Sequence, residues 1–307
     1  MRLLFAGTPA AALPSLCALR DAGHDIVAVA TNPDAPSGRG HKLTPSPVAA
    51  EAASLGIPLL QPARARDPWF VDALTELAPE LAVVVAWGTL VPDALLTVPE
   101  HGWVNLHFSL LPAWRGAAPV QRAIMAGETT TGVTTFQLVH DLDAGPVFRQ
   151  EAVMIGQDET AGELLARLAS IGAEVLGKTV VDIAEGTTPQ PQPEGEVTLA
   201  PKVTPDDARI DWWAAAETVR NLVRGATPDP GAWTTLHGAR VKILRTSVMA
   251  TTDDLIAGQL QADKRVLQVG TGHGALSLDT VQPAGKPPLD GAAWARGARL
   301  NPEDRFE

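Results

Sequence analysis

The run LAVVVAW, from Leu81 to Trp87, is continuously apolar and has no alternating polar positions. Further largely apolar runs lie at Leu3–Ala6, Ile26–Thr31 and Trp103–His107. Strands without polar alternation are buried on both faces, as in a parallel sheet that is covered by helices. Helix-like segments such as Ala10–Ala22 and Asp67–Leu77 separate the runs. The sequence therefore predicts an α/β fold with a doubly wound, mainly parallel sheet.

Three polar residues are candidates for chemistry in this arrangement. In a doubly wound sheet, ligands bind beyond the carboxyl ends of the strands, and His107 ends the fourth run. Asn105 lies two residues earlier, so in a strand its side chain shares a face with His107. Asp143 lies in the later run HDLDAG, from His140 to Gly145. A carboxylate there is placed to orient the imidazole or to favour its charged form.

These residue types suit the transfer of a one-carbon acyl group to an amine. Such a transfer passes through a tetrahedral oxyanion, which needs a hydrogen-bond donor, and the proton of the amine must also be managed. We expect Asn105 and a protonated His107 to stabilise the oxyanion, and Asp143 to orient His107 or to aid proton removal. Both residues also have a structural alternative: the histidine is then hydrogen-bonded within the fold at the strand end, and the aspartate forms a turn. Spacing alone does not decide between these structural roles and the catalytic ones.

Two other kinds of site are not favoured by the sequence. The turn Gly7-Thr8-Pro9 follows the first run as a dinucleotide-binding loop would, but GTPAAA lacks the second and third glycines of that fingerprint. The single cysteine excludes an internal disulfide and a cysteine-built metal site. The seven histidines are scattered, without the close pair of a zincin-like motif, so we expect no metal.

The sequence favours a cytoplasmic protein without a membrane segment. Its start, MRLLFAGTPAAALPSLCAL, has a basic residue and an apolar stretch, but Gly7-Thr8-Pro9 and Pro14 interrupt that stretch. No segment approaches the ~18 uninterrupted apolar residues of a membrane span. A strand, a turn and a helix are the better interpretation of this region.

The length of 307 residues indicates about two domains, and the second half of the chain contains a candidate boundary. TTFQLV and VFRQEAVMI, both after Gly132, predict strands. Glu159–Glu185 predicts a helix with Asp158 or Thr160 as its N-cap. Thr187–Pro205 then carries five prolines and little apolar content, which is typical of a linker.

The region after this linker predicts a small β-barrel. A helix is expected at Ile210–Arg224, followed by short strands at Ala232–Leu236, Arg240–Ser247, Arg265–Val269 and Ala275–Val281. Short strands with glycine-rich turns over about 100 residues are typical of small barrels. We therefore predict a catalytic domain over 1–186, a proline-rich linker over 187–205 and a barrel domain over 206–307.

Several linked blocks of sequence resemble the folate-dependent formyltransferases. They are AWG at Ala86–Gly88, NLHFSLLP at Asn105–Pro112, WRGAAPVQRA at Trp114–Ala123, and GVTTFQL and LDAGPV within Gly132–Val147. Three further blocks resemble the methionyl-tRNA formyltransferases within that family: FAGTP at Phe5–Pro9, GRGHKLTPSPV at Gly38–Val48 and ARIDW at Ala208–Trp212. The resemblance covers essentially the whole chain.

This resemblance implies an activity and a set of partners. The activity is transfer of a formyl group from 10-formyltetrahydrofolate to the amino group of methionine on initiator methionyl-tRNA, for translation initiation. The folate donor is a co-substrate, the initiator tRNA is the acceptor, and the barrel is implied to be of the OB type, a fold that often binds nucleic acid.

Residues that match the family motifs take roles from it. The resemblance makes Asn105, His107 and Asp143 the catalytic residues. It implies that the site for the folate donor is lined by Ser109, Leu110, Leu111 and Pro112, together with Trp87 and Gly88. Phe108 departs from the small residue that is usual at its position. Alternation along a strand predicts that it packs on the opposite face from the pterin.

The resemblance also implies that tRNA meets the loop PDAPSGRGHKLTPSP. A loop of this length inside a compact domain is usually functional or disordered. Arg39 matches the family residue in the loop that enters the acceptor end of the initiator tRNA. We expect Arg39, His41 and Lys42 to meet phosphates or bases, with Arg115 assisting from beside the catalytic segment.

In the second domain, Arg240 and Lys242 share a face of a predicted strand and are the expected tRNA contacts. The formal net charge of −11 counts against binding to nucleic acid, because phosphate contacts supply much of that affinity. The acidic excess lies before residue 204, however, which leaves the second domain near neutral. We expect tRNA binding to depend steeply on salt.

Two other functions stay open at this point. A formyltransferase that acts on an amino-sugar nucleotide would use the same three catalytic residues, and the acidic charge suits it slightly better. The FAGTP start and the GRGHKLTPSPV loop stand against that alternative. A binding module for folate or RNA, without activity, is the third, and the intact Asn105, His107 and Asp143 argue against it. A monomer is the default expectation.

Overall fold

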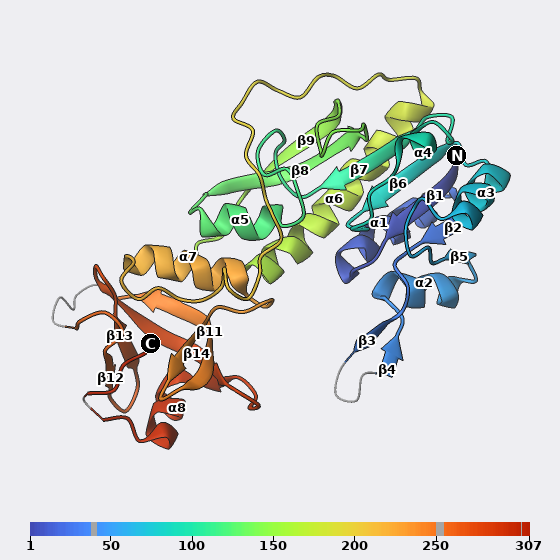
Figure 1. The fold of residues 1–307 in the computed structure, drawn as a ribbon. Coiled ribbons are helices and arrows are strands. Elements are labelled where there is room, and N and C mark those ends of the chain that lie inside the picture. The colour runs from blue at the N-terminus through green and yellow to red at the C-terminus, as the bar shows by residue number, and fades with distance from the viewer. Residues whose placement is uncertain (38–41, 250–254, 302) are drawn as a thin grey trace. The chain divides into compact units, whose positions relative to one another are not determined.

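The computed structural model describes residues 1–37, 42–249, 255–301 and 303–307 (Figure 1). Contacts within the chain divide it into two units. The first contains residues 1–119, 130–154 and 165–200, and the second contains residues 120–129, 155–164 and 201–307. In the part of the chain that is described, no helix is both long and apolar enough to cross a membrane.

The first unit is built on a seven-stranded sheet in the order β5-β2-β1-β6-β7-β8-β9 (Figure 1). Its strands are β1 (Arg2–Gly7), β2 (Asp25–Ala30), β5 (Leu59–Leu60), β6 (Leu81–Val85), β7 (Trp103–His107), β8 (Thr130–Gln137) and β9 (Val147–Met154). The strands from β5 to β7 pair in parallel, whereas β8 is antiparallel to both β7 and β9. Every residue of β6 is buried, as a strand covered on both faces should be. The predicted doubly wound, mainly parallel sheet is confirmed.

Helices connect the strands and begin with recognisable signals. They are α1 (Leu13–Asp21), preceded by the 3₁₀ turn η1 (Ala10–Ala12), then α2 (Pro47–Leu55), α3 (Pro68–Leu77), α4 (Asp93–Leu96), α5 (Pro119–Met125) and α6 (Ala161–Ala184). Thr160 caps α6 rather than Asp158. Its amide and hydroxyl both donate to Glu163 Oε2 at 2.8 Å, and its Oγ1 accepts from the Glu163 amide at 3.4 Å. This is a capping box.

The register of β7 assigns its side chains to the two faces of the sheet. Leu106 lies against α6, because a Cβ on Gly172 would come within 2.8 Å of its side chain. Its partner in β8, Thr135, shares that face and is hydrogen-bonded to Thr179 of α6. Asn105 and His107 alternate with Leu106 and therefore share the opposite face, as predicted.

The predicted loop between β2 and α2 contains a short hairpin. Its strands are β3 (Ala35–Ser37) and β4 (Lys42–Thr44), which pair antiparallel as a separate two-stranded sheet. Ser46 then caps α2 by accepting a hydrogen bond from the Ala49 amide.

The second unit has an antiparallel sheet in the order β10-β11-β14-β13-β12, with β15 also paired to β14. Its strands are β10 (Trp233–Leu236), β11 (Ala239–Val248), β12 (Leu260–Ala262), β13 (Leu267–Gly270), β14 (Ala275–Pro283) and β15 (Leu289–Asp290). Irregular register between Ile243 and Thr246 adds twist to the long β11–β14 pair. The predicted barrel-type domain is confirmed as a curled sheet that forms a half-barrel (Figure 1).

Two helices accompany this sheet, α7 (Ala216–Ala226) and α8 (Gly291–Ala298). The prediction of a helix from Ile210 was wrong at its start. The Ile210 amide donates to the carbonyl of Trp233, so residues before α7 follow the sheet edge instead of coiling. Ile210 and Trp212 are nevertheless buried in the core of the unit, which explains why their spacing imitates a helix.

Candidate active site

The candidate site begins at the end of β7. His107 is the last residue of that strand and is 5% exposed. Its Nε2 lies 2.9 Å from the carbonyl oxygen of Trp114, in the loop that follows. A carbonyl oxygen can only accept, so Nε2 carries a proton and donates it. Because Nε2 carries the proton, Nδ1 has none when the ring is neutral. The imidazole also packs edge-on against Phe136, with ring centroids 6.4 Å apart.

The Asp143 carboxylate faces this second nitrogen. Its Oδ2 lies 3.8 Å from His107 Nδ1, too far for a hydrogen bond but close enough for a strong charge interaction. The same oxygen accepts a hydrogen bond of 2.8 Å from the Gly116 amide. Asp143 has a φ of 47°, an uncommon backbone state for a residue other than glycine. The structure thus brings His107 and Asp143 together from distant parts of the sequence.

The buried position of His107 controls its charge. Burial lowers the pKa of His107, and the Asp143 carboxylate and the Trp114 carbonyl partly oppose that shift. The neutral imidazole is therefore favoured at neutral pH in the free protein. This differs from the expected protonated imidazole, because the sequence does not reveal how completely the ring is removed from water.

Asn105 supplies an amide on the same face of β7. Its side chain is partly exposed, and among the described residues it has no hydrogen-bond partner. Its N–H groups remain available to a ligand, as a donor to an oxyanion must be.

Gly116 supports this geometry for a steric reason. Its φ is 127°, and a Cβ there would lie 2.8 Å from the carbonyl oxygen of Ala200. Only glycine fits this position without displacing the chain. The loop can then direct the Trp114 carbonyl to His107 and the Gly116 amide to Asp143.

The residues predicted to bind the folate donor lie at the ends of β6 and β7. Ser109 is fully buried and donates to the Ala113 carbonyl, and Leu111 is also buried. Leu110 and Pro112 complete the segment. Trp87 is buried and stacks on Trp103, with centroids 6.3 Å apart, so its indole belongs to the core.

Gly88 follows Trp87 with a φ of 75°. Phe108 is 6% exposed, and its packing on the face opposite the pterin stays a prediction. The donor-binding role of all these positions stays a prediction.

The residues predicted to bind tRNA are more dispersed. Arg39 and His41 lie outside the described residues, and Lys42 begins β4. Arg115 is partly buried and donates through Nη2 to Gln192 at 2.6 Å. These assignments also stay predictions.

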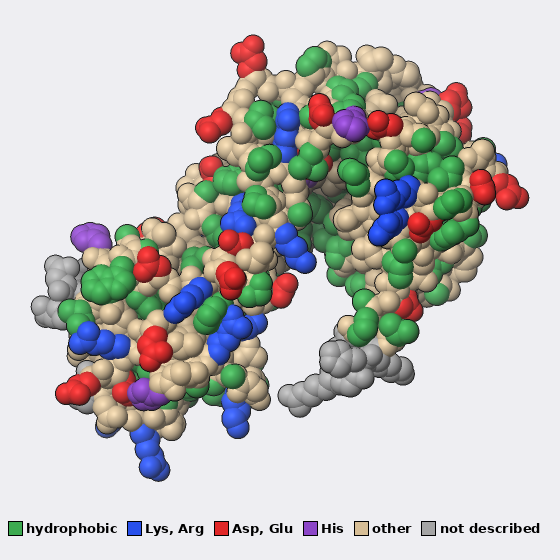
Figure 2. Space-filling model, viewed as in Figure 1, with side chains coloured by type: hydrophobic (Ala, Val, Ile, Leu, Met, Phe, Trp, Pro, Cys, Tyr) green, Lys and Arg blue, Asp and Glu red, His purple; other side chains and the backbone are tan. Residues whose placement is uncertain are grey.

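In the second unit, Arg240 is exposed and its guanidinium lies 3.7 Å from the ring centroid of Trp233. Lys242 donates to the Pro230 carbonyl at 2.6 Å. Lys and Arg side chains, with Asp and Glu among them, gather on the face of this unit seen in Figure 2.

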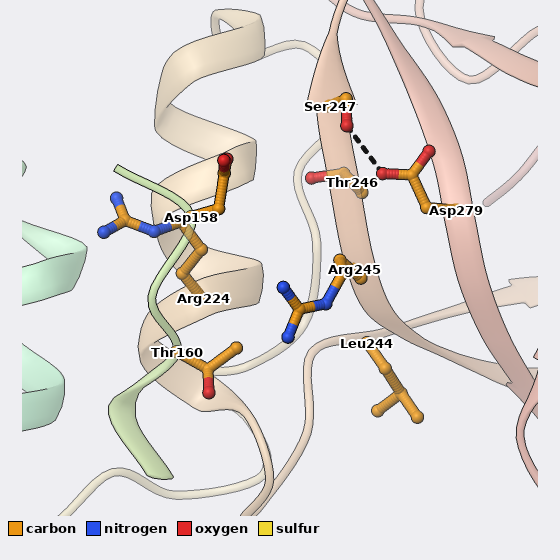
Figure 3. A pocket seen from close by; sticks show the side chains of 8 residues that line it. All are labelled: Asp158, Thr160, Arg224, Leu244, Arg245, Thr246, Ser247 and Asp279. Carbon is orange, nitrogen blue, oxygen red and sulfur yellow. Dashed lines mark hydrogen bonds between the residues drawn. The ribbon is translucent and has the colours of Figure 1, made fainter. Parts of the chain in front are cut away.

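A hollow in the second unit has a different character (Figure 3). It is lined by Asp158, Thr160, Arg224, Leu244, Arg245, Thr246, Ser247 and Asp279. Several of its charged groups are already bonded: Arg245 pairs with Glu163 and Asp158 with Arg220, both at 2.7 Å, and Asp279 accepts from Ser247. None of the predicted catalytic residues lines it. Among the described residues, no group of three or more His, Cys, Asp or Glu is arranged to hold a metal ion.

Comparison with known families identifies the chain. Residues 1–180 match the model described as formyl transferase, and residues 202–299 match the formyl transferase C-terminal domain. The chain belongs to the formyl transferase family. The first match contains Asn105, His107 and Asp143, and the second contains strands β10 to β15 of the antiparallel sheet.

This formyl transferase is similar over its whole length to methionyl-tRNA formyltransferases. It is 52% identical to that of Thermobifida fusca, over 100% of this chain and 99% of that protein. It is 51% identical to that of Streptomyces coelicolor, over 99% of each. A solved N-formyltransferase of Helicobacter canadensis, in complex with folinic acid and dTDP-3-aminofucose, has a TM-score of 0.69 at 17% identity, over 92% of this chain and 99% of that one. This last likeness shows a shared fold.

Sequence reasoning missed three contributors to the candidate site of this formyl transferase. Trp114 acts through its backbone carbonyl and Gly116 through its amide, and the block WRGAAP was a signal that this loop matters. Gln192 donates to the carbonyls of Asp143 and Gly145. It lies in the segment predicted to be a linker, and no motif connects it with the site.

Proposed function

We propose that the chain transfers a formyl group from 10-formyltetrahydrofolate to the amino group of methionine on initiator methionyl-tRNA. The observation that carries this proposal is the convergence of Asn105, His107 and Asp143 at the end of β7, in a member of the formyl transferase family. The high identity with methionyl-tRNA formyltransferases over the full length supports this acceptor over an amino-sugar nucleotide.

In this proposal, the neutral amine of methionine attacks the formyl carbon of the folate donor. A carbon–nitrogen bond forms, and the formyl oxygen becomes the oxyanion of a tetrahedral intermediate. The free N–H groups of Asn105 donate to that oxygen. Collapse of the intermediate breaks the bond to the folate nitrogen, which leaves with a proton, and the formylated methionine stays on the tRNA.

His107 manages the protons in this scheme. Its neutral form is the one that can accept a proton from the attacking amine, and its imidazolium form can return a proton to the leaving folate nitrogen. The Asp143 carboxylate, 3.8 Å away, stabilises the positive charge that develops on the ring between these steps. Because the His107 ring is buried, its pKa is lowered, which favours loss of this proton to the leaving folate nitrogen.

The tRNA is proposed to reach the site with the help of basic residues from both units. The proposed contacts are Arg39, His41, Lys42, Arg115, Arg240 and Lys242. The donor is proposed to bind along Ser109–Pro112 and the Trp87-Gly88 turn. We propose that the chain acts in translation initiation. We propose further that it is cytoplasmic and that it works as a monomer.

The test is transfer of labelled formyl from 10-formyltetrahydrofolate to methionine-charged initiator tRNA, beside charged elongator tRNA and UDP-amino-sugar acceptors. The expected product is formylmethionyl-tRNA on the initiator alone. Arg39→Ala should raise KM for the tRNA, whereas Arg66→Ala, which removes an exposed arginine elsewhere in the first unit, should not. Formylation of the amino sugar alone would support formyl transfer to an amine but would reject methionyl-tRNA as the acceptor.

A further inference from the structure

We propose that Gln192 is a positioning residue for the transfer reaction and that the segment 192–200 is a working part of the active site. This inference rests on the proposed function. The segment was predicted to be a linker, yet it contacts the catalytic loops through side chains and backbone.

The side-chain amide of Gln192 holds the turn that carries Asp143. Its Nε2 donates to the carbonyl of Asp143 at 2.7 Å and to that of Gly145 at 3.0 Å. Its Oε1 accepts from Arg115 Nη2 at 2.6 Å. Carbonyls only accept and a guanidinium only donates, so this arrangement admits one orientation of the amide.

The turn needs such support because its backbone is strained. Asp143 has a left-handed φ of 47°, and residues in that state persist where their surroundings hold them. Gln192 binds the backbone of Asp143, and the Gly116 amide binds its carboxylate. Two hydrogen bonds from different segments therefore fix the distance between the carboxylate and the imidazole of His107.

The same segment also holds the loop on the other side of the imidazole, through its backbone and the Thr198 hydroxyl. Thr198 accepts from the amide of Trp114 through Oγ1 at 2.8 Å, and from the amide of Arg115 through its carbonyl at 2.9 Å. The Ala200 amide donates to the Arg115 carbonyl at 2.7 Å. The loop fixed in this way presents the Trp114 carbonyl to His107. Both partners of the imidazole are thus attached to segment 192–200.

Gln192→Ala removes the two hydrogen bonds to the turn, and Gln192→Glu removes the same donors but keeps an acceptor for Arg115. If Gln192 only fastened the segment, Gln192→Glu would retain activity through the stronger pairing with Arg115. If it positions Asp143, both variants lose activity. Gln190→Ala is the matched control. Within the described part of the chain, the Gln190 side chain donates only to the nearby Thr188 carbonyl, and its backbone pairing with Val147 survives the change.

The experiment measures kcat, KM for each substrate, the pH profile of kcat/KM and the melting temperature. We expect both Gln192 variants to lower kcat by about 10- to 100-fold, since small misplacements of catalytic groups have effects of this size, with little change in KM. Among the described titratable groups, Asp143 is the one whose charge acts on His107. Its displacement should move the acid limb of the profile to lower pH.

Gln190→Ala should match the wild type in every measurement. Three results would each overturn the inference. The first is a wild-type kcat in both Gln192 variants, and the second is a wild-type kcat in Gln192→Glu alone. The third is a lowered kcat with the acid limb of the pH profile at its wild-type position. Failure of the wild type to formylate methionyl-tRNA would instead reject the proposed function. The wild-type assay therefore separates a failure of the proposed function from a failure of the Gln192 inference.

Discussion

Replacing Asp143 with asparagine removes the carboxylate charge that faces His107 and leaves a side chain of almost the same shape. The Gly116 amide still finds an acceptor, so the loop should keep its geometry. At the observed separation of 3.8 Å, the interaction of Asp143 with an imidazolium is worth at most about 4 kcal/mol at an effective dielectric constant of ~20. We therefore expect Asp143→Asn to slow transfer by up to ~10³-fold.

The pH dependence of this variant follows from the same contact. Burial lowers the pKa of His107, and Asp143 opposes that shift, so loss of the carboxylate lowers the pKa further. Because the neutral imidazole accepts the proton of the amine, activity rises as the pH passes upward through this pKa. Asp143→Asn should therefore move the acid limb to lower pH while reducing the plateau.

Single-turnover transfer of labelled formyl, measured from about pH 5 to pH 9 across the ordinary pKa of histidine, reports both effects. Asp141→Asn is the matched control, since Asp141 is an exposed aspartate in the same loop. A plateau equal to that of the wild type, or an acid limb that stays in place, would refute the role given to Asp143.

Asn105→Ala should reduce kcat by ~10²-fold without unfolding the protein, as loss of an oxyanion donor does, and equal kcat in the variant would remove Asn105 from the mechanism. Gly116→Ala should destabilise the first unit by about 1–3 kcal/mol in denaturant unfolding, because its Cβ would meet the Ala200 carbonyl in a left-handed backbone, whereas Gly177→Ala, at an open position of α6, should be neutral or slightly stabilising. Arg220→Met should destabilise the second unit by about 1–3 kcal/mol, because the 5% exposed guanidinium bonds two carboxylates and a carbonyl, and an unchanged unfolding midpoint would contradict this. KM for tRNA should rise steeply with salt, since few phosphate contacts act against an acidic background, and a KM that stays flat would count against those contacts.

The central sheet could be predicted because its strands carry a strong local signal. Every residue of Leu81–Val85 is buried, and so is every residue of Trp103–His107 except the partly exposed Asn105. Burial on both faces eliminates the alternation of polar and apolar residues that a strand with one exposed face would show. The position of His107 at the end of β7 followed from the same pattern. The start of α7 was not predictable in this way, since Ile210 and Trp212 are buried by the sheet edge and not by a helix.

The supporting parts of the site could not be read from local patterns. Trp114 and Gly116 contribute backbone groups, which any residue carries, so their identity gives no direct chemical signal. The contact of Gln192 with the Asp143 turn joins segments that are far apart in the sequence. Its proline-rich surroundings indicated a solvated linker, because composition does not reveal which backbone groups a segment will bind. The charge state of His107 depends on its burial, which is a tertiary property.

The most direct test of the central claim is the single-turnover rate of formyl transfer from 10-formyltetrahydrofolate to methionyl-tRNA by the wild type and by His107→Ala, with folding of the variant checked by its melting temperature. The proposed mechanism predicts transfer by the wild type and a loss of ~10²-fold or more in a folded variant. A folded His107→Ala protein that transfers formyl at the wild-type rate would contradict it.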